Sequence, residues 1–159
     1  MKLVRTIPVT SEEFFTYINE SILNGCNHAT KKFAESDIKE GFSYTVEDDK
    51  HTKTKITLLK YRPNSLYQSK IVSTLDTHIL TYTITPNNDG IEVTFEQDIE
   101  SFNKLKDKSM NKKFQEAFYL GRMSDTLYEI QKEIIAKRNG EVITKEKPSN
   151  NLFTTIFKR

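Results

Sequence analysis

The feature of this sequence that most constrains its fold is a strict alternation of apolar and polar residues on both sides of one turn. The run 80–85 alternates leucine, tyrosine and isoleucine with threonine, and the run 91–99 alternates apolar residues and one glutamine with acidic residues and threonine. The five residues between the runs, Pro-Asn-Asn-Asp-Gly at 86–90, are strong turn formers. A slip of one residue would bury the acidic row. The pattern therefore predicts an antiparallel hairpin with one buried face and one solvated face.

Four further segments carry a period of two and are expected to complete an antiparallel sheet of about six strands. They are residues 2–8, 42–46, 53–62 and 67–75. In the third segment, Leu58 and Leu59 place apolar side chains on both faces, which favours a β-bulge or a strand covered on both sides. Short turns between consecutive strands predict a meander.

Residues 10–25 carry the three- and four-residue spacing of an amphipathic helix. Thr10 and Glu13 have the spacing of a capping box, and Gly25 is a natural C-terminal stop. A short second helix is expected around residues 31–35.

A longer helical period runs from residue 111 to residue 138, which corresponds to a rod of about 40 Å. Its apolar face drifts along its length. The first half centres on Phe114 and Phe118, whereas the second half centres on Leu127 and Ile130. The drift predicts that the two halves contact different partners.

The length and composition of the chain are those of one globular domain. The chain has 159 residues, and we expect a single domain at 1–138 with a tail at 139–159. The one cysteine, Cys26, excludes an intrachain disulfide and suits a reducing compartment. The formal net charge of +2 is too small to indicate a nucleic acid or a membrane surface as partner.

Neither a signal peptide nor a membrane span is expected from the sequence. The apolar residues of segment 1–8 alternate with polar ones, and no apolar core follows them. No apolar run reaches the roughly eighteen residues of a membrane-spanning helix. The expected location is therefore the cytoplasm.

The expected order is a strand, one or two helices, about five antiparallel strands and one long helix, which predicts an α+β fold. With this order of elements, the sequence resembles the helix-grip superfamily. The segments that carry the resemblance are the strand start Gly-Phe-Ser-Tyr at 41–44, the strand Ile-Glu-Val-Thr-Phe-Glu at 91–96 and the helix from Asn111. That superfamily includes START-like lipid-transfer domains and proteins similar to the birch-pollen allergen. More narrowly, the chain resembles an uncharacterised family of such domains from low-GC Gram-positive bacteria. The resemblance implies a curved sheet wrapped on the long helix with an apolar ligand between them, and it implies no catalytic residue.

The first candidate site is the space between this sheet and this helix. Apolar lining with a few placed polar groups is typical of ligand pockets. The candidate lining residues are Tyr44, Ser69, Ser73, Tyr82, Ile84, Val93, Phe95 and Gln97 from the sheet and Phe114, Phe118 and Gly121 from the helix. The alternative is an ordinary filled core, because periodicity does not distinguish a packed interior from a hollow one.

Other features give weaker indications. The lysines Lys104, Lys106, Lys108, Lys112 and Lys113 favour either a solvated connector or an anionic ligand near the start of the long helix. The three histidines, His28, His51 and His78, have no metal-ligand spacing, and the sequence predicts no metal and no cofactor. Leu152, Phe153, Ile156 and Phe157 have the spacing of one helical face, which favours dimerisation, docking of a protein partner, or a cover for the pocket, against a frayed end.

Three functions remain open at this level. The first is a non-catalytic module that binds a small apolar or amphipathic molecule. The second is an interaction domain with a filled core that acts through its surface or its tail. The third is an enzyme that uses isolated tyrosine or serine residues of the pocket, since no nucleophile-elbow, phosphate-loop or dinucleotide motif is present.

Overall fold

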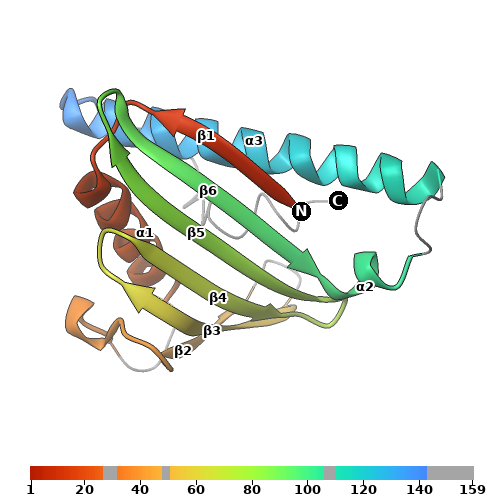
Figure 1. The fold of residues 1–159 in the computed structure, drawn as a ribbon. Coiled ribbons are helices and arrows are strands. Elements are labelled where there is room, and N and C mark those ends of the chain that lie inside the picture. Colours follow the sequence, from red (N-terminus) through yellow and green to blue (C-terminus); the bar gives the residue numbers. More distant parts are fainter. Residues whose placement is uncertain (27–31, 48–50, 106–109, 143–159) are drawn as a thin grey trace.

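A computed structural model describes residues 1–26, 32–47, 51–105 and 110–142 (Figure 1). The strands are β1 (Lys2–Ile7), β2 (Ser43–Glu47), β3 (Lys53–Arg62), β4 (Leu66–Val72), β5 (Thr77–Asn87) and β6 (Gly90–Ile99). The helices are α1 (Ser11–Gly25), α2 (Glu100–Asn103) and α3 (Met110–Arg138), with a 3-10 turn, η1, at Glu35–Asp37. The short helix expected at 31–35 is not found in its described part: residue 31 lies outside the described residues, 32–34 are not helical, and Glu35 begins the 3-10 turn η1.

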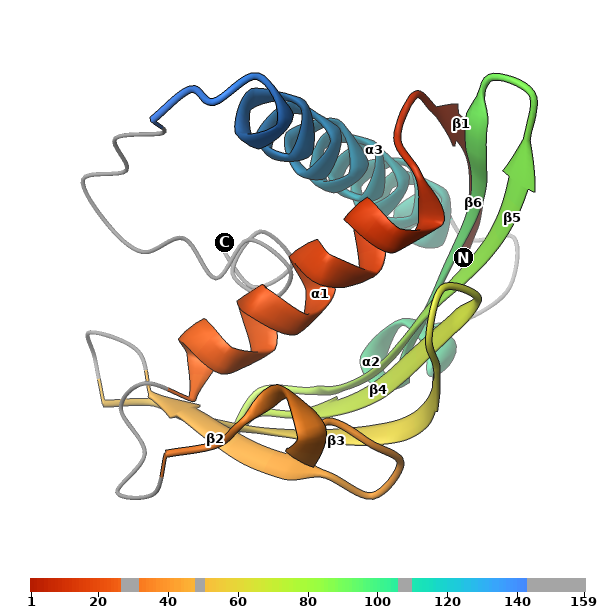
Figure 2. The ribbon, with the colours of Figure 1, turned by 90° about the vertical axis from the view of Figure 1, so that its left-hand side faces the viewer.

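The six strands form one antiparallel sheet in the order β1-β6-β5-β4-β3-β2. Strands β2 to β6 are a meander, as the short turns predict, and β1 adds to the free edge of β6. The sheet bends strongly, so that β1, β6 and β5 form one wall and β4, β3 and β2 form another (Figure 2). The long helix lies on the inner side of this bend. The predicted α+β class and its helix-grip arrangement are confirmed.

The hairpin of β5 and β6 has the predicted register. Tyr82 lies opposite Phe95, and Asn87 lies opposite Gly90, which leaves a two-residue turn. Ile91, Val93 and Phe95 are buried, as the alternation requires. The bulge predicted in β3 is also present, because the pairing with β4 shifts between Leu58 and Lys60.

Helix α1 begins with the predicted capping box. The Thr10 hydroxyl accepts from the Glu13 amide at 3.1 Å, and the Glu13 carboxylate accepts from the Thr10 amide at 2.8 Å. The apolar face of α1 lies across the inner face of the sheet (Figure 2). The rings of Phe14 and Tyr82 are 5.6 Å apart, and those of Phe15 and Tyr61 are 6.0 Å apart. The resemblance implied a sheet wrapped on the long helix, but α1 also covers the sheet, because its aromatic residues reach the rings of Tyr82 and Tyr61.

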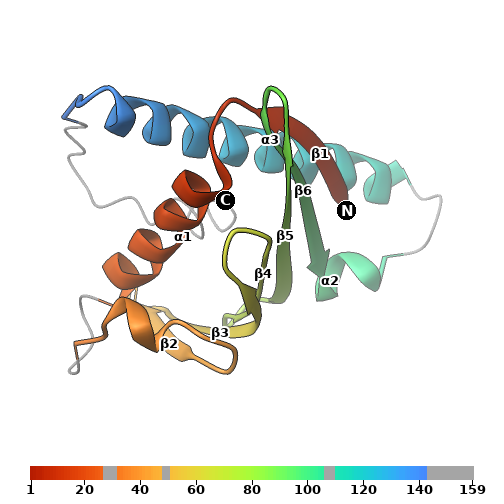
Figure 3. The ribbon, with the colours of Figure 1, turned by 60° about the vertical axis from the view of Figure 1, so that its left-hand side comes forward.

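Helix α3 spans the residues predicted for it, but its fully buried residues all lie from Met123 onward. Met123, Leu127, Ile130 and Ile134 are buried, whereas Phe118 is 57% exposed. Phe118 and Leu127 are nine residues apart, which is about two and a half helical turns, so they lie on opposite sides of the helix. The N-terminal part of α3 extends past the edge of the sheet (Figures 1 and 3). None of the helices in the described ranges has the length and apolarity that crossing a membrane requires.

Candidate functional site

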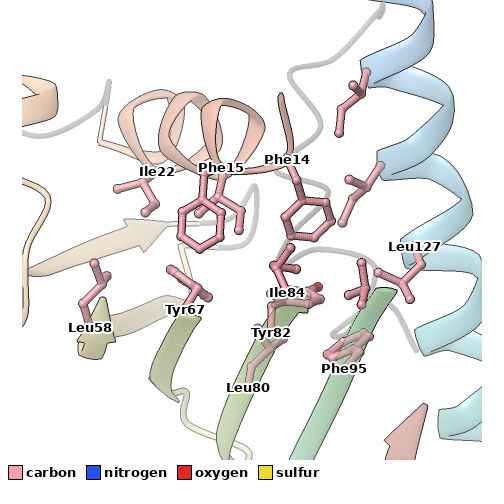
Figure 4. Close-up of a cluster of buried hydrophobic side chains, with 14 of the residues drawn as sticks. Phe14, Phe15, Ile22, Leu58, Tyr67, Leu80, Tyr82, Ile84, Phe95 and Leu127 are labelled. Carbon is pink, nitrogen blue, oxygen red and sulfur yellow. The ribbon is translucent and has the colours of Figure 1, made fainter. Parts of the chain in front are cut away.

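The inner face of the sheet is centred on two buried tyrosines. Tyr67 of β4 lies directly opposite Tyr82 of β5, and their ring centroids are 6.2 Å apart. The next residue in this row is Phe95 of β6, whose ring lies 4.5 Å from that of Tyr82. Figure 4 shows Phe14 of α1 above Tyr82, with Leu127 entering from α3 at the side. This aromatic row therefore lies between the sheet and both helices.

Three hydroxyl groups in this region have no hydrogen-bond partner within the described part of the chain. They belong to Tyr67, Tyr82 and Ser69, and all three residues have no exposed surface. A buried hydroxyl without a partner costs about 1–3 kcal/mol in lost solvation. Such a cluster is the expected signature of a place where a bound molecule or water supplies the missing hydrogen bonds.

Burial keeps both tyrosines in their protonated form. Loss of solvation raises the pKa of Tyr82 well above its ordinary value, and repulsion between the two phenolates, were both ionised, acts in the same direction through Tyr67. Burial also raises the pKa of Tyr67, and the nearby Ser69 hydroxyl offsets part of this rise without reaching hydrogen-bond geometry. At neutral pH the two phenols are therefore hydrogen-bond donors and poor proton acceptors.

Tyr44 extends the polar part of the inner face toward the β2 edge. It is 5% exposed and lies opposite Ile56 on β3. Burial raises the pKa of Tyr44 well above its ordinary value, and Tyr67 and Cys26 act in the same direction. Burial also raises the pKa of the Cys26 thiol to about 11, so this cysteine is an inert core residue.

At the other end of the inner face, Gln97 and His78 form a buried polar pair. The Gln97 amide nitrogen lies 3.2 Å from His78 Nδ1, and Asp76 lies 3.9 Å from His78 Nε2. Burial lowers the pKa of His78, and the Asp76 carboxylate opposes this shift. The histidine is therefore neutral at physiological pH. In the described residues no group of histidine, cysteine and carboxylate side chains is arranged to hold a metal ion.

Among the sheet residues predicted to line the pocket, Tyr44, Ser69, Tyr82, Ile84, Val93, Phe95 and Gln97 all lie in the interior. Ser73 does not, because β4 ends at Val72. Its hydroxyl instead accepts from the amides of Leu75 and Asp76 at 3.2 and 3.1 Å, and so closes the turn between β4 and β5. Whether the interior residues line a pocket stays a prediction.

The three helix residues predicted beside them do not lie over the sheet. Phe114 and Phe118 are 71% and 57% exposed, and nothing lies within 4 Å of where a Cβ of Gly121 would be. The physical reason is the drift of the apolar face, because the core takes the Leu127 side of the helix. Sequence reasoning also omitted Tyr67, although its place on one strand face with Ser69 was a usable signal.

No charged side chain of the described residues enters this interior. The buried polar residues are Asn19, Ser69, His78, Gln97 and Thr126, and none of them carries a charge while His78 is neutral. Asn19 is satisfied by its neighbours, since it accepts from the Tyr61 hydroxyl and donates to Glu35, both at 2.8 Å. The polar groups buried in the described part of the interior are therefore neutral.

Two surface grooves lie away from the buried tyrosines. One, of about 570 Å³, follows the second half of α3 from Tyr128 to Val142. The other, of about 580 Å³, lies between the hairpin turn at 86–91 and the segment 8–12. Their linings contain none of the buried tyrosines, so they are separate from the interior site.

Comparison with solved structures places this fold among known ones. A protein of unknown function from Staphylococcus aureus is similar at a TM-score of 0.58 and 12% identity, over 89% of this chain and 95% of that one. DynU16, from the dynemicin biosynthetic locus, is similar at a TM-score of 0.58 and 10% identity, over 89% of this chain, which spans only 48% of DynU16. The Aha1 dimer from Colwellia psychrerythraea is similar at a TM-score of 0.56 and 7% identity, over 84% of this chain and 94% of that one. At these identities the likeness shows the fold alone.

Comparison of the sequence gives a family. No curated protein matches the chain. One family model, described as "Domain of unknown function (DUF3284)", matches residues 1–120, which include the whole sheet, α1, and the first turns of α3. Because this match covers most of the chain, the protein belongs to the DUF3284 family of domains of unknown function.

Proposed function

We propose that this protein is a non-catalytic binding module that holds a small, uncharged, largely apolar molecule between the sheet and its two covering helices. The observation that carries the proposal is the group of buried hydroxyls on Tyr67, Ser69 and Tyr82 that have no partner in the described residues. A guest with hydrogen-bond acceptors would remove the cost of burying these donors. The resemblance to helix-grip proteins, which hold apolar ligands in this place, supports the same proposal.

The chemistry of the interior limits the guest. Aromatic and aliphatic side chains provide most of the surface, which favours an apolar body. The buried tyrosines are donors, which favours a carbonyl, ether or hydroxyl oxygen on the guest. An ionised carboxylate or phosphate would find no buried counter-ion among the described residues and would lose much of its hydration energy. The guest is therefore a neutral molecule.

The same groups argue against the enzyme hypothesis. A general base needs a pKa near the working pH, and burial moves the pKa values of Tyr67 and Tyr82 upward, away from it. A protonated phenol is instead suited to donate a hydrogen bond to an acceptor oxygen of the bound molecule.

The sharpest test is a substitution that fills the interior. Ser69→Leu adds a branched apolar side chain beside Tyr67 and removes an unpartnered hydroxyl. If the interior holds a guest, native mass spectrometry of the full chain purified from its host shows an added mass that solvent extraction removes, and the Ser69→Leu variant lacks it. If the core is already filled, no such mass is present, and overpacking destabilises the variant by about 1–3 kcal/mol.

Tyr82→Phe tests the hydrogen bond without changing the shape of the site. We expect this variant to retain less of the added mass than the native chain does. Tyr128→Phe is the matched control, since Tyr128 is 56% exposed on the outside of α3. If the native chain and the Tyr82→Phe variant retain the added mass equally, the Tyr82 hydroxyl does not bind the guest.

A further inference from the structure

The first half of α3 exposes an apolar ridge. Met110, Phe114 and Phe118 follow one another at intervals of four residues, so they lie on one side of the helix. Their exposed fractions are 76%, 71% and 57%. Ala117 and Gly121 lie on the same side, and a Cβ on Gly121 would meet nothing within 4 Å. The ridge is therefore largely exposed to solvent, and contiguous exposed apolar residues of this kind mark interaction sites.

Basic residues accompany the ridge on its own helix. Lys112, Lys113 and Arg122 are in the first four turns of α3, whereas Lys104, in the segment before α3, is paired with Glu100 at 2.8 Å. The Arg122 guanidinium lies 4.8 Å from the centre of the Phe118 ring, and the Lys112 ammonium lies 5.2 Å from that of Phe102. Between residues 110 and 122, Glu116 is the only acidic residue of α3.

This excess of basic residues is confined to the helix itself. Acidic residues lie close by, because Asp98 is near the end of β6 and Glu100 is in α2, whose Phe102 ring contacts Lys112. The first four turns of α3 are therefore basic, although the molecule as a whole is nearly neutral.

Three occupants could cover the ridge, and its charge and shape distinguish them. A second copy paired ridge to ridge would bring two sets of lysine and arginine together, and like charges at an interface are unfavourable. A rigid acidic protein would need a cleft that matches a convex helix end. An anionic lipid surface offers both the negative charge and a layer that deforms around aromatic side chains.

We propose that the N-terminal half of α3 docks on anionic lipid surfaces, with Phe114 and Phe118 inserted at the interface and the flanking basic side chains on the lipid headgroups. Helices with aromatic residues on one side and lysine or arginine beside them bind membranes in this way. The N-terminal part of α3 extends past the edge of the sheet (Figure 3). The proposal rests on exposure and charge and does not require the interior to hold a guest.

The test is binding of the full chain to vesicles. Phosphatidylcholine vesicles are compared with vesicles that also contain phosphatidylglycerol, in a flotation or co-sedimentation assay. We expect binding to the anionic vesicles that weakens as salt is raised, because screening shortens the range of the attraction. Phe114→Ser with Phe118→Ser is expected to lower the partition coefficient about tenfold or more. Lys113→Gln is expected to lower it about fivefold, the equivalent of one charge near an anionic surface.

Matched controls lie on the second half of the same helix. Tyr128→Ser removes an exposed aromatic residue and Lys132→Gln removes an exposed lysine, both outside the ridge, and neither is expected to change vesicle binding. Equal binding to both kinds of vesicle, or full binding by the double Phe variant, would overturn the proposal. Concentration-dependent dimerisation that the double variant abolishes, without vesicle binding, would assign the ridge to a second copy. Binding of the ridge to an acidic protein, again without vesicle binding, would likewise overturn it.

Discussion

The side chain of Arg138, the last residue of α3, holds the carboxylate of Glu13 in the first turn of α1. Arg138 Nε donates to Glu13 Oε1 at 2.8 Å, and Nη2 donates to Oε2 at 2.6 Å. Nη2 also lies 3.2 Å from the carbonyl oxygen of Pro8. Because Glu13 also closes the capping box with Thr10, this pair joins the end of one covering helix to the start of the other.

Loss of this pair should loosen the contact between the two helices. We expect Arg138→Ala to destabilise the fold modestly, because the variant loses a partly exposed ion pair whose bidentate geometry is favourable. Thermal unfolding followed by circular dichroism measures the change, expected as a fall in Tm of about 1–4 °C. Lys132→Ala on the same helix is the control, and an equal fall in both variants would contradict a specific role for the pair.

The same pair should make stability depend on pH in the acid range. Hydrogen bonding to Arg138 lowers the pKa of Glu13 from 4.5 to about 2. The folded state thus keeps Glu13 ionised at pH values where the unfolded chain binds a proton. The stabilisation is present above about pH 4.5 and is lost as the pH falls toward 2. Urea unfolding across this range should show that the difference between the native chain and Glu13→Gln shrinks as the pH falls, and a constant difference would contradict the prediction.

His78 should destabilise the fold at mildly acidic pH. Burial lowers its pKa in the folded state, so the unfolded chain binds a proton first as the pH falls below the ordinary value of 6.5. Protonation of His78 has no effect on the free energy of unfolding above pH 6.5. Below that pH it destabilises the fold increasingly, until the pH reaches the lowered pKa that His78 has in the folded state. His78→Gln keeps a polar group beside Gln97 and cannot bind this proton. Between pH 7 and 5, the stability of the native chain should therefore fall more than that of the variant, and parallel curves would refute the assignment.

The buried hydroxyls should respond differently to removal according to whether they are bonded. Tyr61 donates to Asn19 at 2.8 Å, so Tyr61→Phe is expected to cost about 1 kcal/mol. Tyr82 has no such partner among the described residues, so in ligand-free protein Tyr82→Phe should be neutral or stabilising. Chemical denaturation of both variants measures the contrast. A loss for Tyr82→Phe as large as that for Tyr61→Phe would show that the Tyr82 hydroxyl is bonded in solution.

Gly90 should be the glycine least tolerant of substitution among those with positive φ. At φ +130°, a Cβ would lie 2.2 Å from the carbonyl oxygen of Ile7, which is backbone and cannot move alone. We expect Gly90→Ala to cost at least about 2 kcal/mol, from clash and backbone strain together. Gly41→Ala is the control, because Gly41 has φ +86° but open space around it. Its cost should be about 1 kcal/mol, from the backbone alone, and equal losses would contradict the close approach of β1.

The sequence by itself determined the parts of this protein that depend on neighbours in the chain. The alternation in 80–99 determined the hairpin, its register and its buried face, because one face of the strands packs on the core and the other faces solvent. Thr10 and Glu13 determined the start of α1, since the capping box closes within one turn. The inward positions of Ser69 and Tyr82 followed from the same period of two.

Only the tertiary structure decided which apolar surfaces meet. Phe118 and Leu127 are equally good core residues by composition, but they lie on opposite sides of one helix, and the bend of the sheet accepts only the Leu127 side. Periodicity reports that a face is apolar and says nothing of what lies opposite it. For the same reason, the sequence did not show that the Tyr82 hydroxyl lacks a partner among the described residues, because a hydrogen bond depends on atoms that distant strands and helices bring within about 3 Å.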